Sequence, residues 1–422
     1  MEEQEKEIIA DLHIHSRFSR ACSKDLNIAN LVKWAKIKGL DLLGTGDFTH
    51  PEWLRELKNL KQENGILWYD DGERFPFILS SEISLMYTQN SKGRKVHLVY
   101  LAPSFEVVDK INEWLDSIGR RDYDGRPIFN ISCRDFAAKM EEIDGMIEII
   151  PAHIWTPWFG IFGSMSGFDS LEEAFGDRVG RINSIETGIS SDPAMNWKIK
   201  NLENKSIVSF SDSHSFWPWR LGREATIFVL KEGEELSYDL ILNQIRGNSF
   251  KATIETDPAY GKYHFDGHSV CGFSCSPDET EKFNGICPVC GNSLTVGVDN
   301  RVLKLSKKSS SDYKNKKDYY TLLPLHEIIS LGLGFGMNSK ACWNIYNKLI
   351  KNFKNEFNVL LKASRENLMN VLEDSNLTDL ILKNREGKIK VKPGYDGVYG
   401  KALLDKHEPD IKKTSEVQKK LF

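Results

Sequence analysis

Histidine and carboxylate side chains recur along the first half of the chain at spacings that suit metal binding. In "DLHIH", His13 and His15 stand at i and i+2, so on a strand both imidazoles point to one face. Neutral imidazole is a good ligand for zinc and other divalent transition metals. An HxH pair can equally be a polar strand edge, so further ligands must decide between the two interpretations.

Further candidate ligands follow at intervals along the chain. They are Asp47 and His50 in "TGDFTH", Glu82 in "SSE", His97 in "KVHLVYL", His153 in "IIPAH", and Asp212 and His214 in "SFSDSH". Buried without partners, such groups would each cost on the order of a few kcal/mol. Crowded together, they would also shift one another's pKa values strongly unless cations neutralised them. The recurrence therefore favours two or three divalent metals, with zinc expected first and manganese or magnesium as alternatives.

The elements that must position these side chains alternate between two types over residues 7–230. Apolar runs such as "IIADLHIH", "LDLLGTG", "FPFILSSE" and "MIEIIPAH" predict strands, and stretches such as "NIANLVKWAKIKG", "CRDFAAKMEEI" and "DPAMNWKIKNLEN" predict helices between them. The candidate ligands, and Glu186 with them, stand at or just beyond the C-terminal ends of the predicted strands. Active sites of α/β barrels are built at that face, so an α/β barrel is favoured over a doubly wound sheet.

Length and composition indicate a globular protein of several domains. The 422 residues exceed the usual size of one domain, and 40% are hydrophobic and 27% charged. No apolar run of about 18 residues occurs, which predicts no membrane partner. The acidic start "MEEQEKE" is unlike a signal peptide, so we expect a cytoplasmic, nucleoid-associated protein.

Charge is distributed unevenly along the chain. From Arg301 to Phe422 there are 24 lysines and arginines against 14 acidic residues, a net charge of +10, which leaves −14 for residues 1–300. A basic region on an acidic body suggests a polyanionic partner, although a lysine-rich solvated surface would give the same count.

Four of the seven cysteines fall within twenty residues and predict a structural zinc site. Cys271, Cys275, Cys287 and Cys290 form a C-x3-C pair and a C-x2-C pair, "CGFSC" and "CPVCG". Four thiolates complete a tetrahedral shell, with His264 and His268 in "KYHFDGH" as competing ligands. The expected domains are a metal-dependent barrel over 1–232 with an extension over 233–265, a zinc-binding module over 266–303, a linker over 304–323, and a basic helical domain over 324–422.

The histidine and carboxylate motifs together resemble the polymerase and histidinol phosphatase (PHP) family. The resemblance implies a distorted seven-stranded β/α barrel, (β/α)7, around metals. Matched motif by motif, His13, His15, Glu82 and Asp212 would hold one metal and activate a water molecule. Glu82 would bridge to a second metal on His97 and His153, and His50 and His214 would hold a third.

One part of the PHP pattern is missing. The family often has an acidic residue soon after HxH, where this chain has Ser19, Arg20 and Ala21. Asp47 is the candidate replacement, which leaves Asp47 and His50 as alternatives at the third site. Arg20 instead suits a phosphate oxygen, as an anion clamp, or a plain surface salt bridge.

Longer motifs resemble the endonuclease Q family over nearly the whole chain. They include "DLHIHSRFSRACSKDL", "GTGDFTHPEW", "SFSDSHSFWPWRLGREAT", "CPVCGNSLTVGV" and "KPGYDGVYG". This resemblance implies a metal-dependent DNA repair endonuclease that cuts the phosphodiester 5′ of a deaminated base (uracil, hypoxanthine or xanthine) or of an abasic site. A small-molecule phosphomonoesterase and a non-catalytic DNA-binding PHP protein are the alternatives.

Two further predictions concern partners. Arg17, Phe18, Arg20, Ser190 and Ser191 are the candidates to contact damaged DNA at the mouth of the barrel. The final residues "SEVQKKLF" resemble a shortened peptide that binds a sliding clamp, or else form a frayed polar tail.

Overall fold

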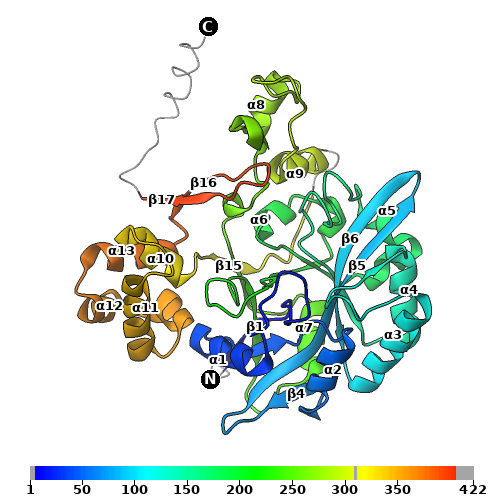
Figure 1. Cartoon of the computed structure of the whole chain (residues 1–422), viewed down its shortest axis with the longest axis horizontal. Coiled ribbons are helices and arrows are strands. Elements are labelled where there is room, and N and C mark those ends of the chain that lie inside the picture. The colour runs from blue at the N-terminus through cyan, green and yellow to red at the C-terminus, as the bar shows by residue number, and fades with distance from the viewer. Residues whose placement is uncertain (1–4, 308–310, 405–422) are drawn as a thin grey trace.

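The computed structural model describes residues 5–307 and 311–404. It has three parts, which Figure 1 shows side by side: a large α/β body, an arm that carries helix α8 (Pro277–Lys282), and a group of helices from α10 (Leu325–Leu333) to α13 (Ser375–Arg385). The predicted combination of an α/β domain with a helical C-terminal region is therefore confirmed.

An 11-stranded mixed sheet forms the centre of the body. Its main path runs β15–β12–β11–β1–β2–β5–β4–β3, with β6 between β5 and β8, and β7 beside β5. The strands are β1 (Lys6–Asp11), β2 (Leu42–Gly44), β3 (Lys61–Glu63), β4 (Ile66–Tyr69), β5 (Phe75–Gln89), β6 (Lys92–Ala102), β7 (Ile128–Phe129), β8 (Glu148–Pro151), β11 (Ala225–Leu230), β12 (Ala252–Glu255) and β15 (Asp318–Thr321). The pairs β1–β2 and β2–β5 are parallel, as the alternation of strands and helices predicts, whereas β1–β11 is antiparallel.

Two more strands complete a ring of strand ends. β9 (Ser184–Glu186) pairs in parallel with β10 (Ser206–Val208). Beyond β8, the amide of Ile154 donates to the Glu186 carbonyl, and beyond β1, the amide of His15 donates to the Ser213 carbonyl. The ends of β1, β2, β8, β9 and β10 and the middle of β5 and β6 therefore surround a common centre, which we call the ring of strand ends. Glu82, expected at the end of a strand, instead lies in the middle of β5, because that strand continues to Gln89.

The pair β5–β6 differs from the expected parallel alternation. These two long strands run antiparallel in one continuous hairpin, the long ribbon of Figure 1. Asn90 and Ser91 at its turn both have positive φ, 52° and 59°. Two consecutive residues of this kind fit the right-handed twist of a two-residue hairpin, which leaves no room for a helix between the strands.

Helices pack outside the sheet by one apolar face. They are α1 (Ile28–Lys38), α2 (Pro51–Leu57), α3 (Phe105–Ile118), α4 (Cys133–Ile143), α5 (Leu171–Phe175), α6 (Pro193–Asn196) and α7 (Tyr238–Arg246), with 3-10 turns at Gly176–Arg181 and Lys200–Leu202. In α3, Ser104 caps the N-terminus while Val108, Ile111 and Leu115 are buried at helical spacing.

The helix predicted over 192–204 is shorter in the structure. Only α6 and the 3-10 turn at Lys200–Leu202 form there. The buried Asn196 side chain donates to the Asp192 carbonyl and to the Ser191 hydroxyl, at 2.8 and 3.1 Å. Such local hydrogen bonds from an asparagine compete with continuation of a helix.

The arm leaves the body after a 3-10 turn at Pro258–Tyr260. It contains the short hairpin β13 (Asp266–His268) and β14 (Phe273–Cys275), a 3-10 turn at Ser269–Cys271, α8, and α9 (Val298–Ser306). The segment expected to be a linker, 304–323, contributes strand β15, which pairs in parallel with β12 of the body.

The C-terminal helices are fixed to the body by a buried ion pair. Lys38 of α1 contacts Glu356 at 2.7 Å, and both side chains are at most 1% exposed. Glu356 follows α11 (Lys340–Phe353); beyond it come a π-helical turn at Asn358–Lys362, α12 (Arg365–Leu372), α13, and the hairpin β16 (Lys390–Lys392) and β17 (Lys401–Leu403). Among the helices of residues 5–307 and 311–404, none combines the length and the apolar character that a membrane span requires.

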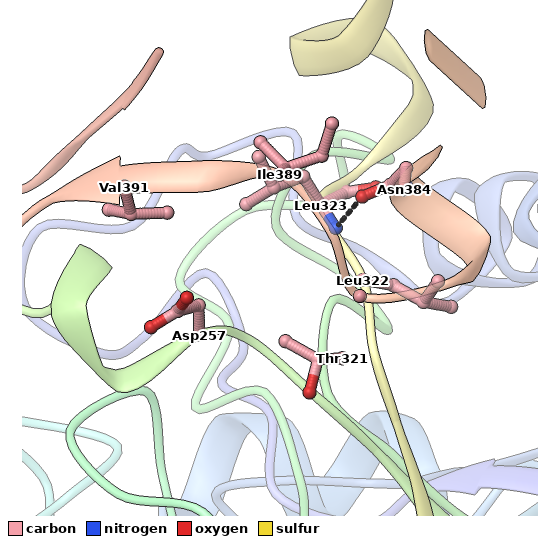
Figure 2. Close-up of a pocket in the computed structure, with 8 residues that line it drawn as sticks. Asp257, Thr321, Leu322, Leu323, Asn384, Ile389 and Val391 are labelled. Atoms are coloured by element: carbon pink, nitrogen blue, oxygen red, sulfur yellow. Dashed lines mark hydrogen bonds between the residues drawn. The ribbon is translucent and has the colours of Figure 1, made fainter. Parts of the chain in front are cut away.

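A small hollow lies where the body, β15 and the C-terminal helices meet (Figure 2). The Asn384 side chain closes one side of it by accepting from the Leu323 amide and donating to the Leu323 carbonyl, both at 2.9 Å. Its other lining residues are Asp257, Thr321, Leu322, Gly387, Ile389 and Val391. None of the candidate metal ligands lines it, so this hollow belongs to the joint between the parts.

Candidate metal centre

His13 and His15 leave β1 with both side chains buried and aimed into the ring of strand ends. The Nε2 atom of His13 lies 3.5 Å from Glu82 Oε2 and from Asp212 Oδ1, and that of His15 lies 3.2 and 3.1 Å from the same two oxygens. Two ligands of a tetrahedral zinc stand about 3.3 Å apart. These four residues therefore have the spacing of a metal site.

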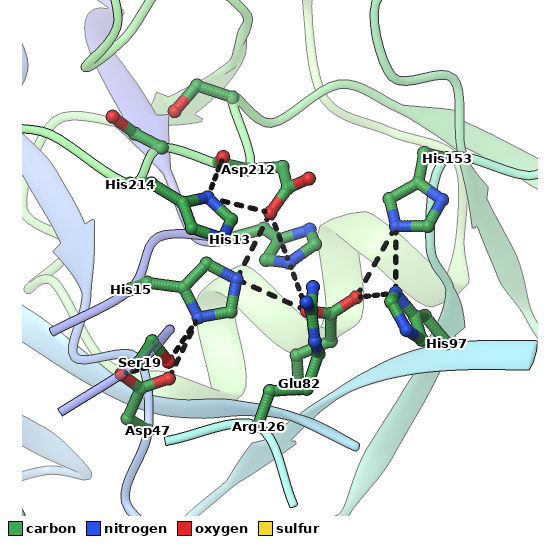
Figure 3. Close-up of polar contacts among 12 residues, drawn as sticks. His13, His15, Ser19, Asp47, Glu82, His97, Arg126, His153, Asp212 and His214 are labelled. Carbon is green, nitrogen blue, oxygen red and sulfur yellow. Dashed lines mark hydrogen bonds and ion pairs between the residues drawn. The ribbon is translucent and has the colours of Figure 1, made fainter. Parts of the chain in front are cut away.

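Glu82 also faces a second pair of imidazoles (Figure 3). Its other oxygen, Oε1, lies 2.8 Å from His97 Nδ1 and 3.4 Å from His153 Nε2. Glu82 and His97 reach each other because β5 and β6 pair with Ser84 opposite His97, two residues along from Glu82 on the same face. One carboxylate thus stands between two ligand groups. We call these six residues the carboxylate–histidine cluster: His13, His15, Glu82, His97, His153 and Asp212.

The donor set fits divalent metal ions. His13 Nε2 and Glu82 Oε1 are buried atoms that make no hydrogen bond of good geometry among the described residues, although other ligand atoms lie within 3.5 Å of each. A buried polar atom of this kind is costly unless something binds it. Imidazole and carboxylate are ligands that zinc and manganese accept.

The far nitrogens of the two histidines are held by further carboxylates. His13 Nδ1 lies 2.9 Å from Glu186 Oε1, and Glu186 also accepts from the His153 amide at 2.8 Å. His15 Nδ1 lies 2.9 Å from Asp47 Oδ1. Hydrogen bonds of this type orient a metal-binding imidazole and raise its basicity. Asp47, a candidate ligand from the sequence, is thus placed behind His15.

Three of these residues have left-handed backbone conformations. Asp47, His153 and Asp212 have φ of 48°, 32° and 47°. Non-glycine residues rarely adopt such angles, and they gather at functional sites where the surroundings enforce them. The loops after three different strands are therefore bent to bring these side chains to the centre.

Charge compensation sets the pKa values in the cluster. Burial lowers the pKa of His13, but Glu186, Glu82 and Asp212 outweigh it and raise the pKa well above its usual value. Burial raises the pKa of Glu82, yet Arg126 and the histidines hold it well below its usual value. The carboxylates are thus held in the ionised form that a cation requires.

The structure does not assemble the predicted third group. The His50 ring stacks on Phe18 at 4.3 Å, and its Nδ1 has no partner among the described residues. His214 Nδ1 lies 3.7 Å from Asp212 Oδ1, beside the first group. Neither histidine belongs to a set of three close ligand atoms in the described part of the chain, so the third site stays a prediction.

The candidate substrate-binding residues lie in different environments. Arg17 is paired with Glu56, and Phe18 packs between His50 and Trp53. Arg20 is exposed, and Ser190 and Ser191 are buried, with the Ser191 hydroxyl donating to the Thr187 carbonyl. Their role in substrate binding stays a prediction.

The arm holds a second group of ligands, the cysteine cluster: His268, Cys271, Cys287 and Cys290. His268 Nδ1 lies 3.5 Å from Cys290 Sγ. Cys275, the fourth cysteine of the predicted set, instead points into the small core of the arm, 3% exposed and 3.3 Å from the Thr280 hydroxyl. The close ligand atoms of the arm thus include His268 in place of Cys275, and the four-cysteine site stays a prediction.

Comparisons with known proteins cover almost the whole chain. The lesion-specific endonuclease PfuEndoQ of Pyrococcus furiosus matches with a TM-score of 0.84 and 31% identity over 97% of this chain and 99% of that one. Endonuclease Q in complex with a 27-mer duplex bearing an abasic lesion matches with a TM-score of 0.83 and 31% identity over 96% and 100%. The chain belongs to the endonuclease Q family.

Two sequence relatives match much of the chain of this endonuclease Q family member. The uncharacterised protein YqxK of Bacillus subtilis is 27% identical over 94% of this chain and 99% of its own. The uncharacterised protein MJ0043 of Methanocaldococcus jannaschii is 33% identical over 67% of this chain, which spans only 35% of that longer protein. A family model described as the MJ0043 C-terminal domain matches residues 324–388, within the helical part.

Two residues beside the cluster of this endonuclease Q family member were not predicted as site residues. Glu186 is the last residue of β9 in "INSIETG". Its position at the end of a strand was the one feature of the sequence that could have indicated a role at the site. Arg126 lies in the loop before β7, and its Nη1 donates to Glu82 Oε2 at 2.9 Å. No spacing in "DYDGRPIF" relates that arginine to a glutamate 44 positions earlier, so only the fold brings them together.

Proposed function

We propose that this protein is a metal-dependent DNA repair endonuclease that hydrolyses the phosphodiester 5′ of a deaminated base or an abasic site. The observation that carries the proposal is the position of Glu82 between two buried ligand groups. The near full-length similarity to lesion-specific endonucleases supports DNA as the substrate.

In this proposal the ring of strand ends is a PHP-type barrel with metals at its mouth. His13, His15, Glu82 and Asp212 hold one divalent cation, and Glu82, His97 and His153 hold another. When bound, such a pair of cations lowers the pKa of water and stabilises the charge on a phosphoryl group.

The protein's own residues do the remaining work. Glu186 and Asp47 fix the tautomer and orientation of His13 and His15, so each presents Nε2 to the centre. Asp212 is the more accessible of the two carboxylates of the cluster, with a side chain 29% exposed. No separate general base is assigned.

The arm is proposed to bind one structural zinc and to extend the DNA-binding surface. Its ligand set leaves no open position for catalysis, because three cysteines and one histidine fill a tetrahedral shell. The sliding-clamp peptide proposed at 415–422 lies outside the described residues.

Cleavage of defined duplexes tests this function. End-labelled duplexes with one uracil, hypoxanthine or abasic site, and an undamaged duplex of the same sequence, are incubated with metal-stripped and metal-reloaded protein. We expect a single cut 5′ of the lesion that requires divalent metal. Asp212→Asn should abolish it, whereas Glu52→Gln, an exposed residue paired with Arg55, should not.

Other outcomes would favour other functions. Equal cutting of damaged and undamaged strands would contradict lesion specificity. Hydrolysis of small phosphate monoesters alone would favour the phosphomonoesterase, and DNA binding with neither activity would favour a non-catalytic DNA-binding protein.

A further inference from the structure

Arg126 is held over the carboxylate–histidine cluster by a loop that is fixed on both sides of it. On one side, the Gly125 amide donates to the Phe18 carbonyl at 3.0 Å and its carbonyl accepts from the Thr49 hydroxyl at 3.1 Å. On the other side, the Pro127 carbonyl accepts from the Ser84 amide at 3.0 Å. These anchors lie on the loop after β1 and on β5, which carry cluster residues, and on the loop after β2, which carries Asp47 behind His15.

The loop packs so closely on the residues behind His15 that no side chain fits at position 125 without a shift of those residues. A Cβ atom at Gly125 would lie 2.2 Å from Asp47 Oδ2 and 2.3 Å from the Ser19 hydroxyl. Those two groups orient His15 through hydrogen bonds. The backbone beside Arg126 therefore rests directly on the residues that position a metal ligand.

The guanidinium of Arg126 lies beside the Glu82 carboxylate (Figure 3). Nη1 donates to Glu82 Oε2 at 2.9 Å, the same oxygen that faces His13 and His15. The side chain is 24% exposed, and Glu82 is its only side-chain partner in the described part of the chain. A guanidinium carries five N–H donors, so most of the fork is left to contact a bound group.

The other arginines near the site are occupied or turned away. Arg17 is paired with Glu56, and Arg121 is paired with Asp116 and donates to the Thr49 carbonyl. Arg20, the anion clamp suggested by the sequence, is exposed and has no side-chain contact to a cluster residue in the described chain. Arg126 alone among these four touches a cluster carboxylate.

We propose that Arg126 binds a nonbridging oxygen of the scissile phosphate at the metal cluster. The inference deepens the proposed endonuclease function and rests on it. A guanidinium matches the geometry of phosphate oxygens and cannot be deprotonated in proteins. Its place beside Glu82 lets it stabilise the charge that develops on the phosphoryl group, in the same space that the metals face.

The alternative is that Arg126 only neutralises the charge of Glu82. The two roles predict different results when Arg126 is replaced. A counter-charge would act through metal binding, because loss of Arg126 would disturb Glu82. A phosphate ligand would act through anion binding and the rate of cleavage, with metal content unchanged.

The test compares Arg126→Ala and Arg126→Lys with Arg120→Ala. Arg120 lies on the same loop, is 76% exposed and pairs with Asp122, so it is a matched control. Metal content per chain, the affinity of the metal-loaded protein for inorganic phosphate, and the single-turnover cleavage of an abasic duplex are measured for each.

We expect Arg126→Ala to keep its metals, to bind phosphate at least about tenfold more weakly, as loss of a hydrogen bond to a charged group predicts, and to cleave about 10²–10³-fold more slowly. Arg126→Lys should fall between, because lysine keeps the charge but lacks the planar fork. Arg120→Ala should match the wild type.

Two results would overturn the inference. The first is that Arg126→Ala binds phosphate as tightly as the wild type. The second is that Arg126→Ala loses metals from the carboxylate–histidine cluster and that excess metal restores both its metal content and its cleavage. A wild-type protein that cuts no lesion duplex, but whose phosphate affinity depends on Arg126, would refute the proposed function and leave the phosphate contact standing.

Discussion

The carboxylate–histidine cluster and the cysteine cluster assemble metal ligands in opposite ways. The first collects six residues from position 13 to position 212, and all except Asp212 are at most 8% exposed. The second collects four residues between 268 and 290, with Cys290 exposed at the surface of the arm.

The difference concerns what each site needs for its assembly. The first is held by the folded α/β body, by second carboxylates and by loop residues with left-handed backbone conformations, so protein groups orient its ligands. The second rests on a hydrophobic core of only three buried residues among those described, Cys275, Cys287 and Leu294, so a bound metal would supply much of its stability. We infer a preorganised catalytic site in the body and a metal-dependent fold in the arm.

Glu82→Gln should show the largest effect and should be confined to the body. The neutral amide removes the charge shared by both ligand groups, so we expect cleavage to fall at least about 10³-fold, the upper range for loss of one electrostatic group. Metal analysis should show that the body has lost its ions while one zinc stays in the arm. Loss of the arm zinc as well would contradict the independence of the two clusters.

His268→Ala and Cys275→Ala should separate the ligands of the arm. With His268 replaced, we expect about one zinc fewer per chain and faster proteolysis within 266–303, because metal binding and local folding are coupled there. Cys275→Ala should keep its zinc and lose only packing against Leu294. The reverse result, with zinc lost only from the Cys275 variant, would restore the four-cysteine site.

Glu186→Gln should have a moderate effect on metal affinity. The amide still reaches His13 Nδ1 but no longer carries the charge that raises the basicity of the imidazole. We expect metal affinity of the body to fall about 10–100-fold, with cleavage restored by excess metal. Asp47→Asn should behave in the same way. If this variant instead loses one bound metal that excess metal does not restore, Asp47 is a direct ligand.

The sequence predicted the parts of these sites that local spacing controls. His13 and His15 were found because alternation on a strand places them together, and Glu82, His97, His153 and Asp212 because each stands on or just beyond a strand of a repeated pattern. The α/β fold followed from the same pattern, whereas the β5–β6 hairpin did not, since the conformation of Asn90 and Ser91 decides it.

What the sequence missed depends on orientation and on distant contacts. Cys275 matches a zinc pattern, but on β14 it faces the core of the arm, while His268 faces the other cysteines. Arg126 reaches Glu82 only because its loop is fixed on Phe18, Thr49 and Ser84. Spacing along the chain encodes neither contact.

The smallest expected effect is a pH dependence of stability that comes from two buried glutamates of the body and not from the arm. Glu224 and Glu255 are fully buried in the body, and Oε2 of Glu224 has no partner among the described residues. Burial raises the pKa of Glu224 to about 8, against an ordinary value of 4.5, with Arg223 opposing and Glu186 adding to the shift. Burial and Glu224 together raise the pKa of Glu255.

The sign follows from proton linkage. Between pH 4.5 and about 8 the folded chain keeps a proton on Glu224 that the unfolded chain releases, so stability falls as pH rises through this window. Glu224→Gln removes that titration. In denaturant unfolding of the full, metal-saturated chain, we expect the stability lost from pH 5.5 to pH 8 to shrink by about 3 kcal/mol in Glu224→Gln. Exposed Glu232→Gln should keep the wild-type dependence of stability on pH. If stability in Glu224→Gln still depends on pH as in the wild type, other groups cause the pH sensitivity. If the pH dependence disappears when zinc is removed from the arm, the cysteine cluster causes it.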